Sequence, residues 1–287
     1  MPAIAYVNGS FVPQDEAKIS IMDRGFLFAD GIYEVSAVLD GKLVDNAMHM
    51  ARLERSVGEI GLPLPVPVKR IAELMKELVQ KNGLKEGLVY LQVTRGAEAT
   101  RNFPFPKEMK PSLVMFCDFK AFVDSPQART GIKLKSVEDI RWVRRDIKSV
   151  ALLAQVLAKQ AAAAEGCQEA LMHEGGVVTE GGSSTAFIVK GEGASARIVT
   201  RENSTKILPG CTRRALMDLA KETGIEIEER AFTLEEAYNA KEAFITSATS
   251  FVMPVTEIDG RAIGGGQVGP VARRLRELYV EHARRGQ

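Results

Sequence analysis

Cysteine and histidine are scarce in this chain of 287 residues, which has three of each. The cysteines (Cys117, Cys167 and Cys211) are odd in number and far apart, so a disulfide framework is not expected, and their pattern fits a reducing cytosol. The histidines are scattered and no Cys-x-x-Cys motif occurs, which argues against a metal site. We therefore expect neither a disulfide scaffold nor a metal enzyme.

An excess of charge of one sign is also missing. Lysine and arginine number 38 against 37 aspartates and glutamates, for a net charge of +1, so no general attraction for nucleic acid or an anionic membrane is expected. A nucleic-acid-binding protein that uses Arg141, Arg144 and Arg145 is an alternative from another functional class. The chain lacks the interleaved aromatic and basic residues that would favour it.

Long apolar runs are absent as well. No stretch approaches the roughly 18 apolar residues of a membrane span. The first five residues do not begin a basic region followed by a long apolar core, so no signal peptide is predicted. We expect a cytoplasmic protein without a membrane partner.

The length and an apolar content of 45% suit two domains, each with its own core. Residues 1–120 are expected to form a smaller N-terminal domain of strands and two helices. Within it, Asn8-Gly9 predicts a hairpin, because this dipeptide tolerates the positive φ angles of a tight turn. Residues 121–126 are the expected linker, and residues 127–287 form the larger C-terminal domain.

Strands and helices alternate along the chain. Apolar residues at helical spacing and helix-end signals predict helices over 47–60, 71–82, 150–165, 209–222 and 268–283. Runs of β-forming residues predict strands over 88–94, 112–118, 131–137, 169–173, 185–190, 197–200, 225–229 and 242–246. Interleaved elements with short connections predict a mixed α/β (α+β) fold.

Two residues carry the strongest chemical signal. Lys148, in Asp146-Ile147-Lys148-Ser149, is followed 32 residues later by Glu180. A pyridoxal-phosphate enzyme needs a lysine that forms a Schiff base and, for electron withdrawal, an acid that pairs with the ring nitrogen. Neither residue is diagnostic alone, because most lysines are solvated surface charges.

Three further features could bind a phosphate. Residues 208–213 (LPGCTR) place a glycine and a hydroxyl where a helix begins, and free N–H groups there favour an anion. Residues 246–250 (TSATS) are a run of hydroxyls after an apolar strand. Arg52 could add a charged contact. Each has a plain structural explanation, namely a helix cap, a turn and a solvated helix face. Their occurrence together with Lys148 is more persuasive than any one of them.

Taken together, the chain resembles the class IV aminotransferases, the fold type IV pyridoxal-phosphate family, and within it the D-amino acid aminotransferases. The resemblance covers essentially the whole length. It is carried by residues 6–9 (YVNG), 23–35 (DRGFLFADGIYEV), 139–142 (DIRW), 146–149 (DIKS), 179–181 (TEG), 208–213 and 246–250. It implies a two-domain enzyme with the cofactor at the domain interface, and a homodimer.

The resemblance also implies roles for single residues. Lys148 would be the catalytic, imine-forming lysine and Glu180 the partner of the pyridine nitrogen of pyridoxal 5'-phosphate. The phosphate ligands would be Arg52, the backbone at Cys211 and Thr212, and the Thr249 hydroxyl. Ser184 and Thr185 would line the ring face.

For the substrate, the resemblance implies a tyrosine and an Arg-x-His pair that bind the carboxylate, the pair coming from the neighbouring subunit. Tyr33 and Arg101 match this pattern, whereas Phe103 stands at the histidine position. Phenylalanine donates no hydrogen bond, and losing a bond to a charged group costs roughly 1.5–3 kcal/mol. A weaker or rearranged carboxylate site is therefore expected.

The implied reaction is ping-pong transamination between a D-amino acid, such as D-alanine, and a 2-oxo acid, such as 2-oxoglutarate. A branched-chain L-amino acid aminotransferase is the nearest rival, although residues 33–37 (YEVSA) lack the glycine and arginine usual there. An R-selective amine transaminase and an aminodeoxychorismate lyase share the cofactor lysine, so motifs separate them poorly. A catalytically inactive fold kept for interactions is disfavoured by the presence of Lys148 and Glu180.

Overall fold

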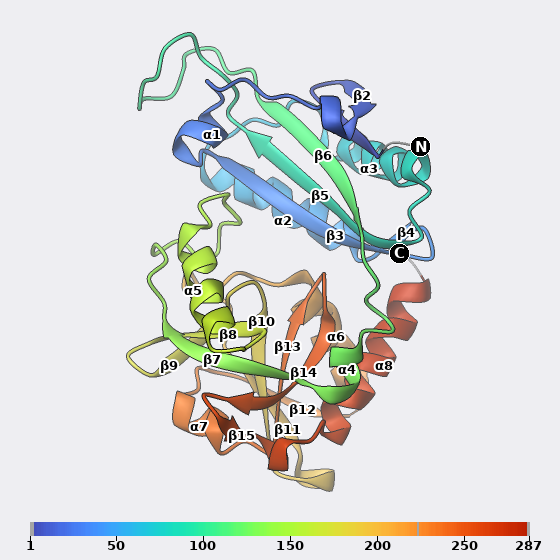
Figure 1. Ribbon diagram of the computed structural model, residues 1–287, viewed down its shortest axis with the longest axis vertical. Helices are drawn as coiled ribbons and strands as arrows, with labels where there is room; N and C mark the ends of the chain where they lie inside the picture. Colours follow the sequence, from blue (N-terminus) through green and yellow to red (C-terminus); the bar gives the residue numbers. More distant parts are fainter. Residues whose placement is uncertain (1–2, 223, 286–287) are drawn as a thin grey trace. The chain divides into compact units, whose positions relative to one another are not determined.

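A computed structural model describes residues 3–222 and 224–285. The chain forms two compact units, and each is described by itself (Figure 1). Unit 1 comprises residues 3–121, 147–151 and 283–285, and unit 2 comprises residues 122–146 and 152–282. The short segment that carries Lys148 therefore belongs to unit 1, although the residues on either side of it belong to unit 2. Whether either unit folds as an independent domain stays a prediction.

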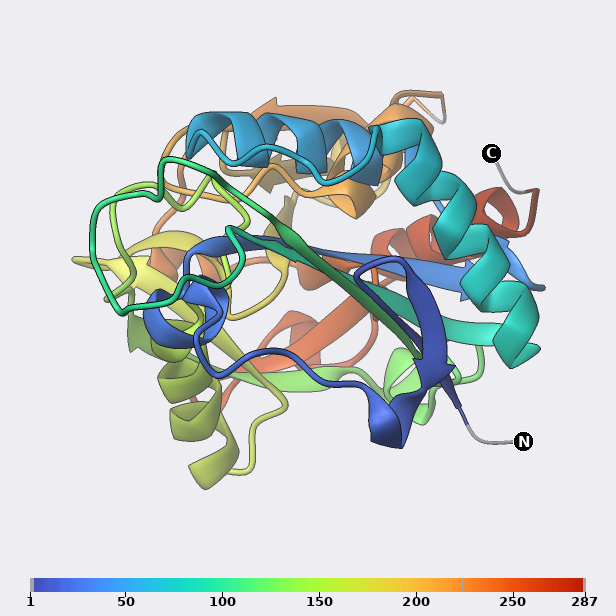
Figure 2. The same cartoon turned by 90° about the horizontal axis from the view of Figure 1, so that it is seen from above.

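Unit 1 is built on a six-stranded antiparallel sheet in the order β2-β1-β6-β5-β3-β4. Its strands are β1 (Ile4–Val7), β2 (Ser10–Pro13), β3 (Gly31–Leu39), β4 (Lys42–Leu43), β5 (Glu86–Thr94) and β6 (Ser112–Phe119). Its helices are α1 (Arg24–Phe28), α2 (Asn46–Glu59) and α3 (Val68–Asn82), with a 3-10 turn at Gln14–Glu16. Figure 2 shows α2 and α3 beside the sheet formed by β3, β5 and β6.

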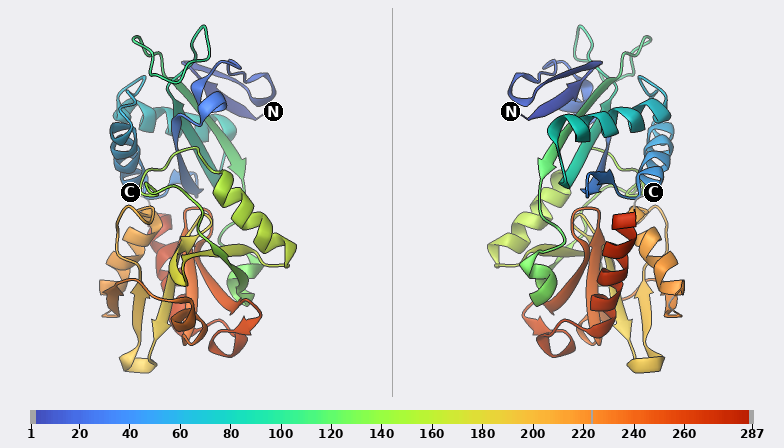
Figure 3. Two further views of the ribbon diagram at one scale, coloured as in Figure 1. Left: turned by 90° about the vertical axis from the view of Figure 1, so that its left-hand side faces the viewer. Right: turned by 90° about the vertical axis from the view of Figure 1, so that its right-hand side faces the viewer.

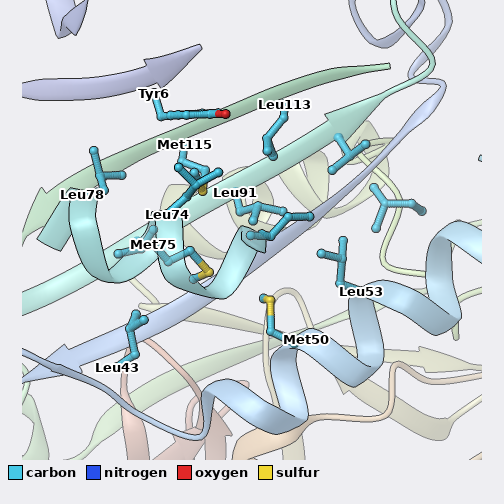
Figure 4. Close-up of a cluster of buried hydrophobic side chains, with 14 of the residues drawn as sticks. Tyr6, Leu43, Met50, Leu53, Leu74, Met75, Leu78, Leu91, Leu113 and Met115 are labelled. Carbon is cyan, nitrogen blue, oxygen red and sulfur yellow. The ribbon is translucent and has the colours of Figure 1, made fainter. Parts of the chain in front are cut away.

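The core of unit 1 lies between these two helices and the sheet. Leu74, Met75 and Leu78 share one face of α3 and are at most 3% exposed. Figure 4 shows them with Leu91 of β5 and Met115 of β6, in the cluster that also takes in α2. Burying each such side chain contributes about 1.5–3 kcal/mol. This packing fixes the face of the sheet against which α2 lies.

Unit 2 is built on a nine-stranded mixed sheet in the order β12-β11-β10-β13-β14-β7-β8-β9, with β15 paired to β14. Its strands are β7 (Ile132–Glu138), β8 (Glu169–Glu174), β9 (Val177–Gly181), β10 (Thr185–Lys190), β11 (Arg197–Thr200), β12 (Glu226–Glu229), β13 (Glu242–Ser247), β14 (Phe251–Ile258) and β15 (Arg261–Ala262). Its helices are α4 (Pro126–Thr130), α5 (Leu153–Ala164), α6 (Cys211–Glu222), α7 (Leu234–Tyr238) and α8 (Pro270–Arg285), with 3-10 turns at Gly193–Ser195 and Gly264–Gly266. The last three residues of α8 belong to unit 1.

Figure 3 shows α8, drawn in red near the end of the chain, beside the sheet of unit 2, and its side chains contact residues around the beginning of β14. The Tyr279 ring of α8 lies 5.1 Å from that of Phe251, and Arg276 donates to the carbonyls of Ser250 and Val252. Across the part of the chain that the structure describes, no helix combines the length and apolar character needed to cross a membrane.

The mixed α/β class is confirmed, and most of the predicted elements are present. The hairpin turn is confirmed, with Val7 paired to Ser10 and positive φ at Asn8 and Gly9. The predicted start of the helix at residue 150 is wrong, because Val150 donates its N–H to the carbonyl of Gly31 and α5 begins at Leu153. Strands β3, β4, β9, β14 and β15 and the short helices α1, α4 and α7 were not predicted.

Candidate active site

Lys148 is fixed by main-chain hydrogen bonds beside β3. Tyr33 donates its N–H to the Lys148 carbonyl at 3.0 Å, and Ser149 forms a bridge with Ile32. The Lys148 N–H also donates to Ser56 Oγ of α2 at 3.5 Å. Lys148 Nζ lies 4.0 Å from the centroid of the Tyr33 ring. The structure thus brings together the residue predicted to form the imine and one predicted to bind substrate.

Arg52 lies on α2 and forms a two-point ion pair with Glu34 of β3. Arg52 Nε is 2.7 Å from Glu34 Oε1, and Arg52 Nη2 is 2.8 Å from Glu34 Oε2, which also lies 2.8 Å from His49 Nδ1. Burial alone would raise the pKa of Glu34, but Arg52 and His49 hold that pKa well below its ordinary value of 4.5. The buried carboxylate therefore stays ionised and orients the Arg52 guanidinium, whose role as a phosphate ligand stays a prediction.

Glu180 lies in β9 of unit 2 and is 4% exposed. Its carboxylate accepts a hydrogen bond from Arg141 Nη1 at 2.6 Å and from the N–H of Leu208 at 3.1 Å. Burial raises the pKa of Glu180, and these two donors offset only part of that rise. Glu180 is thus a carboxylate whose orientation is fixed from two sides.

Arg141 links Glu180 to a second buried acid. Its Nε and Nη2 donate to Asp139 at 2.9 and 2.7 Å, and Thr179 Oγ1 donates to the same carboxylate at 2.6 Å. Burial would raise the pKa of Asp139, but Arg141 and the Thr179 hydroxyl lower it. The guanidinium therefore has one acid on each side, and Asp139 holds it in the orientation that meets Glu180.

Hydroxyl groups gather around the beginning of α6. Thr185 of β10 pairs with Thr246 of β13, and a Cβ at Gly210 would lie 2.9 Å from Thr185 Oγ1, so only glycine fits there without displacing that hydroxyl. Cys211 and Thr212, the first two residues of α6, are 5% and 3% exposed. The free N–H groups at the beginning of a helix are ready donors to an anion.

Two buried hydroxyls lack a hydrogen-bond partner among the described residues, Ser184 Oγ and Thr246 Oγ1. A buried polar group without a partner costs about 1–3 kcal/mol, so a ligand that accepts from these hydroxyls would recover that energy. Thr249 Oγ1 lies 3.3 Å from Ser247 Oγ in the turn after β13. This part of unit 2 fits an oxygen-rich anion or ring ligand.

Arg101 and Phe103 lie in the loop between β5 and β6. The Arg101 guanidinium lies over the rings of Phe28 and Phe103, at 4.7 and 5.1 Å from their centroids. Phe103 is 71% exposed. Among the described residues, no hydrogen bond or ring contact joins either of them to Tyr33, which instead stacks on Tyr90 at 5.7 Å.

Four residues of these clusters were not predicted: Glu34, His49, Asp139 and Arg141. Glu34 and the Asp139–Arg141 pair lie within the motifs that carry the family resemblance, which is the signal that could have identified them. The hydrogen bond between Arg141 and Glu180 could not be predicted, because these residues lie 39 positions apart in the sequence.

The three arginines of the nucleic-acid alternative are matched by carboxylates. Arg144 pairs with Asp146 at 3.0 Å, and Arg145 pairs with Glu174 at 2.8 Å, while Arg141 is buried between two acids. These three arginines therefore do not form an unpaired basic cluster. Nor does the described part of the chain contain a group of three or more His, Cys, Asp or Glu residues able to hold a metal.

Comparison with known proteins decides the family. The sequence profile of Amino-transferase class IV matches residues 31–258. The chain belongs to the class IV aminotransferases. That range includes Lys148, Glu180 and residues 208–213 and 246–250. The resemblance drawn from the motifs is confirmed.

Individual relatives agree with this family. The chain is 42% identical to a D-alanine aminotransferase of Staphylococcus haemolyticus over 280 residues, 96% of each chain. It is 38% identical to the D-alanine aminotransferase of Bacillus licheniformis over 268 residues, 93% of each chain. Its fold is similar to that of the T.th. branched-chain amino acid aminotransferase with pyridoxamine 5'-phosphate, with a TM-score of 0.89 and 29% identity over 99% of this chain and 95% of that one.

Proposed function

We propose that this aminotransferase uses pyridoxal 5'-phosphate to move an amino group between a D-amino acid, such as D-alanine, and a 2-oxo acid, such as 2-oxoglutarate. The observation that carries the proposal is the near full-length similarity to D-alanine aminotransferases at 38–42% identity. The solved relative with pyridoxamine 5'-phosphate supports the choice of cofactor.

Two observations fit this cofactor: the buried Ser184 hydroxyl lacks a partner among the described residues, and a side chain at Gly210 would crowd the Thr185 hydroxyl. The residues proposed to hold it are those implied by the family motifs. Glu180 would accept from the pyridine nitrogen, and Ser184 and Thr185 would line the ring. Arg52, the N–H groups of Cys211 and Thr212, and the Thr249 hydroxyl would take the phosphate. When bound, the cofactor supplies an electron-withdrawing ring that accepts the electron pair released with the α-proton.

Lys148 has two roles in this proposal. Its Nζ would hold the cofactor between turnovers and, once released, would carry the proton from the α-carbon of the amino acid. The main-chain hydrogen bonds to β3 fix the base of this side chain, so the amine moves only through its own four-carbon stem. Tyr33, whose ring lies 4.0 Å from Nζ, would contact the substrate on the same side.

Arg141 supports Glu180 in this proposal. A carboxylate that pairs with the pyridine nitrogen must be ionised and correctly oriented, and burial opposes ionisation. The ion pair with Arg141 opposes that effect and points one oxygen of Glu180 in a fixed direction. We also propose a cytoplasmic homodimer, on the basis of the family resemblance.

A branched-chain L-amino acid aminotransferase is the second candidate. It is favoured by the similarity to the T.th. enzyme, and Phe103 in place of a histidine leaves an apolar side chain near the predicted carboxylate site.

A chiral transamination assay separates these functions. The holoenzyme is incubated with 2-oxoglutarate and either D-alanine or L-leucine, and the product glutamate is resolved by chiral chromatography, with Lys148→Ala as the inactive control. The proposal expects D-glutamate from D-alanine. Formation of L-glutamate from L-leucine alone would contradict it, and pyruvate release from aminodeoxychorismate would instead identify the lyase.

A further inference from the structure

The loop that carries Arg101 is long and has no helix or strand of its own. It spans residues 95–111, between the end of β5 and the beginning of β6. Loops longer than about 12–15 residues without secondary structure are uncommon in compact domains and are often functional. Such a loop needs contacts from elsewhere if its side chains are to be held in defined positions.

Arg24, the first residue of α1, supplies those contacts through the main chain of the loop. Its Nη1 donates to the carbonyl of Asn102 at 2.6 Å, and its Nη2 donates to the carbonyl of Phe103 at 3.0 Å. The same guanidinium pairs with Glu98 at 3.0 Å. Arg24 is only 4% exposed. Three points of the loop on both sides of Arg101 are therefore tied to one buried cation.

The Arg24 guanidinium is itself fixed by a neighbouring cluster. Its Nε is 2.8 Å from Asp30 Oδ2, and Arg95 Nε lies 2.8 Å from the same oxygen. The Arg95 side chain is fully buried and lies 3.6 Å from the centroid of the Phe105 ring. Arg95 also donates to the carbonyls of Ile60 and Gly61. Arg95, the first residue of the loop, thus joins Phe105 to the body of unit 1.

A lysine could not replace Arg24 in this arrangement. The planar guanidinium presents five N–H donors in a fixed fork, whereas an ammonium group presents three from a single point. Arg24 uses Nε toward Asp30 and both terminal nitrogens toward the loop. Its contacts with carbonyls from two successive residues require that geometry.

We propose that Arg24, oriented by Asp30 and Arg95, is a positioning residue that sets the conformation of residues 98–105 so that Arg101 meets the substrate carboxylate. This inference rests on the proposed function, in which Arg101 binds that carboxylate. The Asp23-Arg24-Gly25 motif thereby gains a role in substrate selection. A purely structural role would predict a general loss of stability without a localised change in the loop.

Brief digestion of the folded holoenzyme with trypsin tests directly whether Arg24 holds the loop, because trypsin cleaves after arginine and Arg101 is exposed. The variants are Arg24→Gln, Arg24→Lys and Asp30→Asn. Arg70→Gln is the control, since Arg70 is an exposed arginine paired with Glu73 and Glu77 on α3. Mass spectrometry locates the first cut. Cleavage after Arg101 should be about ten-fold or more faster in Arg24→Gln than in the control, since several charged hydrogen bonds are lost. Equal rates would overturn the proposal.

Steady-state kinetics then separate positioning from general damage. Arg24→Gln should raise the KM for the amino acid about ten-fold with a smaller change in kcat, and Arg24→Lys should recover only part of that loss. A fall in kcat with unchanged KM would contradict the proposal. Asp30→Asn provides the same readout if Arg24→Gln does not fold. If the enzyme accepts only L-amino acids, the proposed D-specificity fails. The cleavage and KM measurements, made with the accepted substrate, still test whether Arg24 positions the loop.

Discussion

At the scale of single residues, two buried glutamates, Glu34 of unit 1 and Glu180 of unit 2, have pKa values shifted in opposite directions. Burial acts on both, but Glu34 has two cationic partners, Arg52 and His49, which lower its pKa well below 4.5. Glu180 has Arg141 and the N–H of Leu208, and its pKa stays raised. Glu34 is therefore ionised at neutral pH and orients a cation, whereas the raised pKa of Glu180 leaves its charge more dependent on the groups beside it.

This difference predicts how stability depends on pH. Because the folded-state pKa of Glu34 is lowered, its contribution is fully present above its ordinary value of 4.5 and is lost as pH falls toward the lowered pKa. Glu34→Gln should destabilise the protein by about 3–5 kcal/mol at neutral pH, because Arg52 loses its buried partner. The difference in the free energy of unfolding between this variant and the parent should be smaller at about pH 3. Urea unfolding at neutral pH and at about pH 3 measures this difference, and Glu73→Gln, at an exposed position, is the control. An equal difference at the two pH values would refute the explanation.

At the scale of elements, the pairing of β5 with β6 depends on a glycine. Gly87 has φ +155°, and a Cβ there would meet the carbonyl oxygen of Asp118 on β6. Gly83, which ends α3 at φ +58°, has open space around it. Gly83→Ala should therefore cost about 1 kcal/mol, the strain of a left-handed conformation. Gly87→Ala should cost clearly more, because backbone cannot move aside as a side chain can. Thermal melting of the two variants compares them, and equal costs would show that β6 yields.

The same elements show how far sequence patterns reach. Strand β5 alternates buried and partly exposed residues and was predicted, whereas β3 was missed. Polar Glu34 and Ser36 of β3 face the buried side, where Glu34 pairs with Arg52 and His49 of α2. Polar residues therefore occupy positions of β3 where a strand pattern would show apolar ones, so the alternation of apolar and polar residues is not visible in the sequence. Lys148 and Glu180 could be predicted from local motifs, but the Arg141–Glu180 contact is long-range and has no local signature.

At the scale of the whole molecule, the proposed homodimer makes a quantitative prediction. If Arg101 acts on the substrate of the partner subunit, Lys148→Ala alone should be inactive, and Arg101→Ala alone should have little activity at a substrate concentration well below its raised KM. Mixed dimers of the two would contain one site with both residues intact. Random reassortment should then restore about a quarter of the parental activity, because half of the dimers are mixed and each has one good site of two. The measurement is activity after joint refolding, and no recovery would place Arg101 in the site of its own chain.

The Arg24 contacts have a further consequence for which residues of this loop can change during evolution. Arg24 binds carbonyl oxygens at residues 102 and 103, and every amino acid carries that group. Side chains at these positions can therefore be exchanged without loss of the anchor. A histidine and a phenylalanine at position 103 would be presented on the same backbone, so substrate preference can diverge by single mutations. Directed evolution of selectivity would do best to randomise residues 102 and 103 while leaving Arg24, Asp30 and Arg101 unchanged.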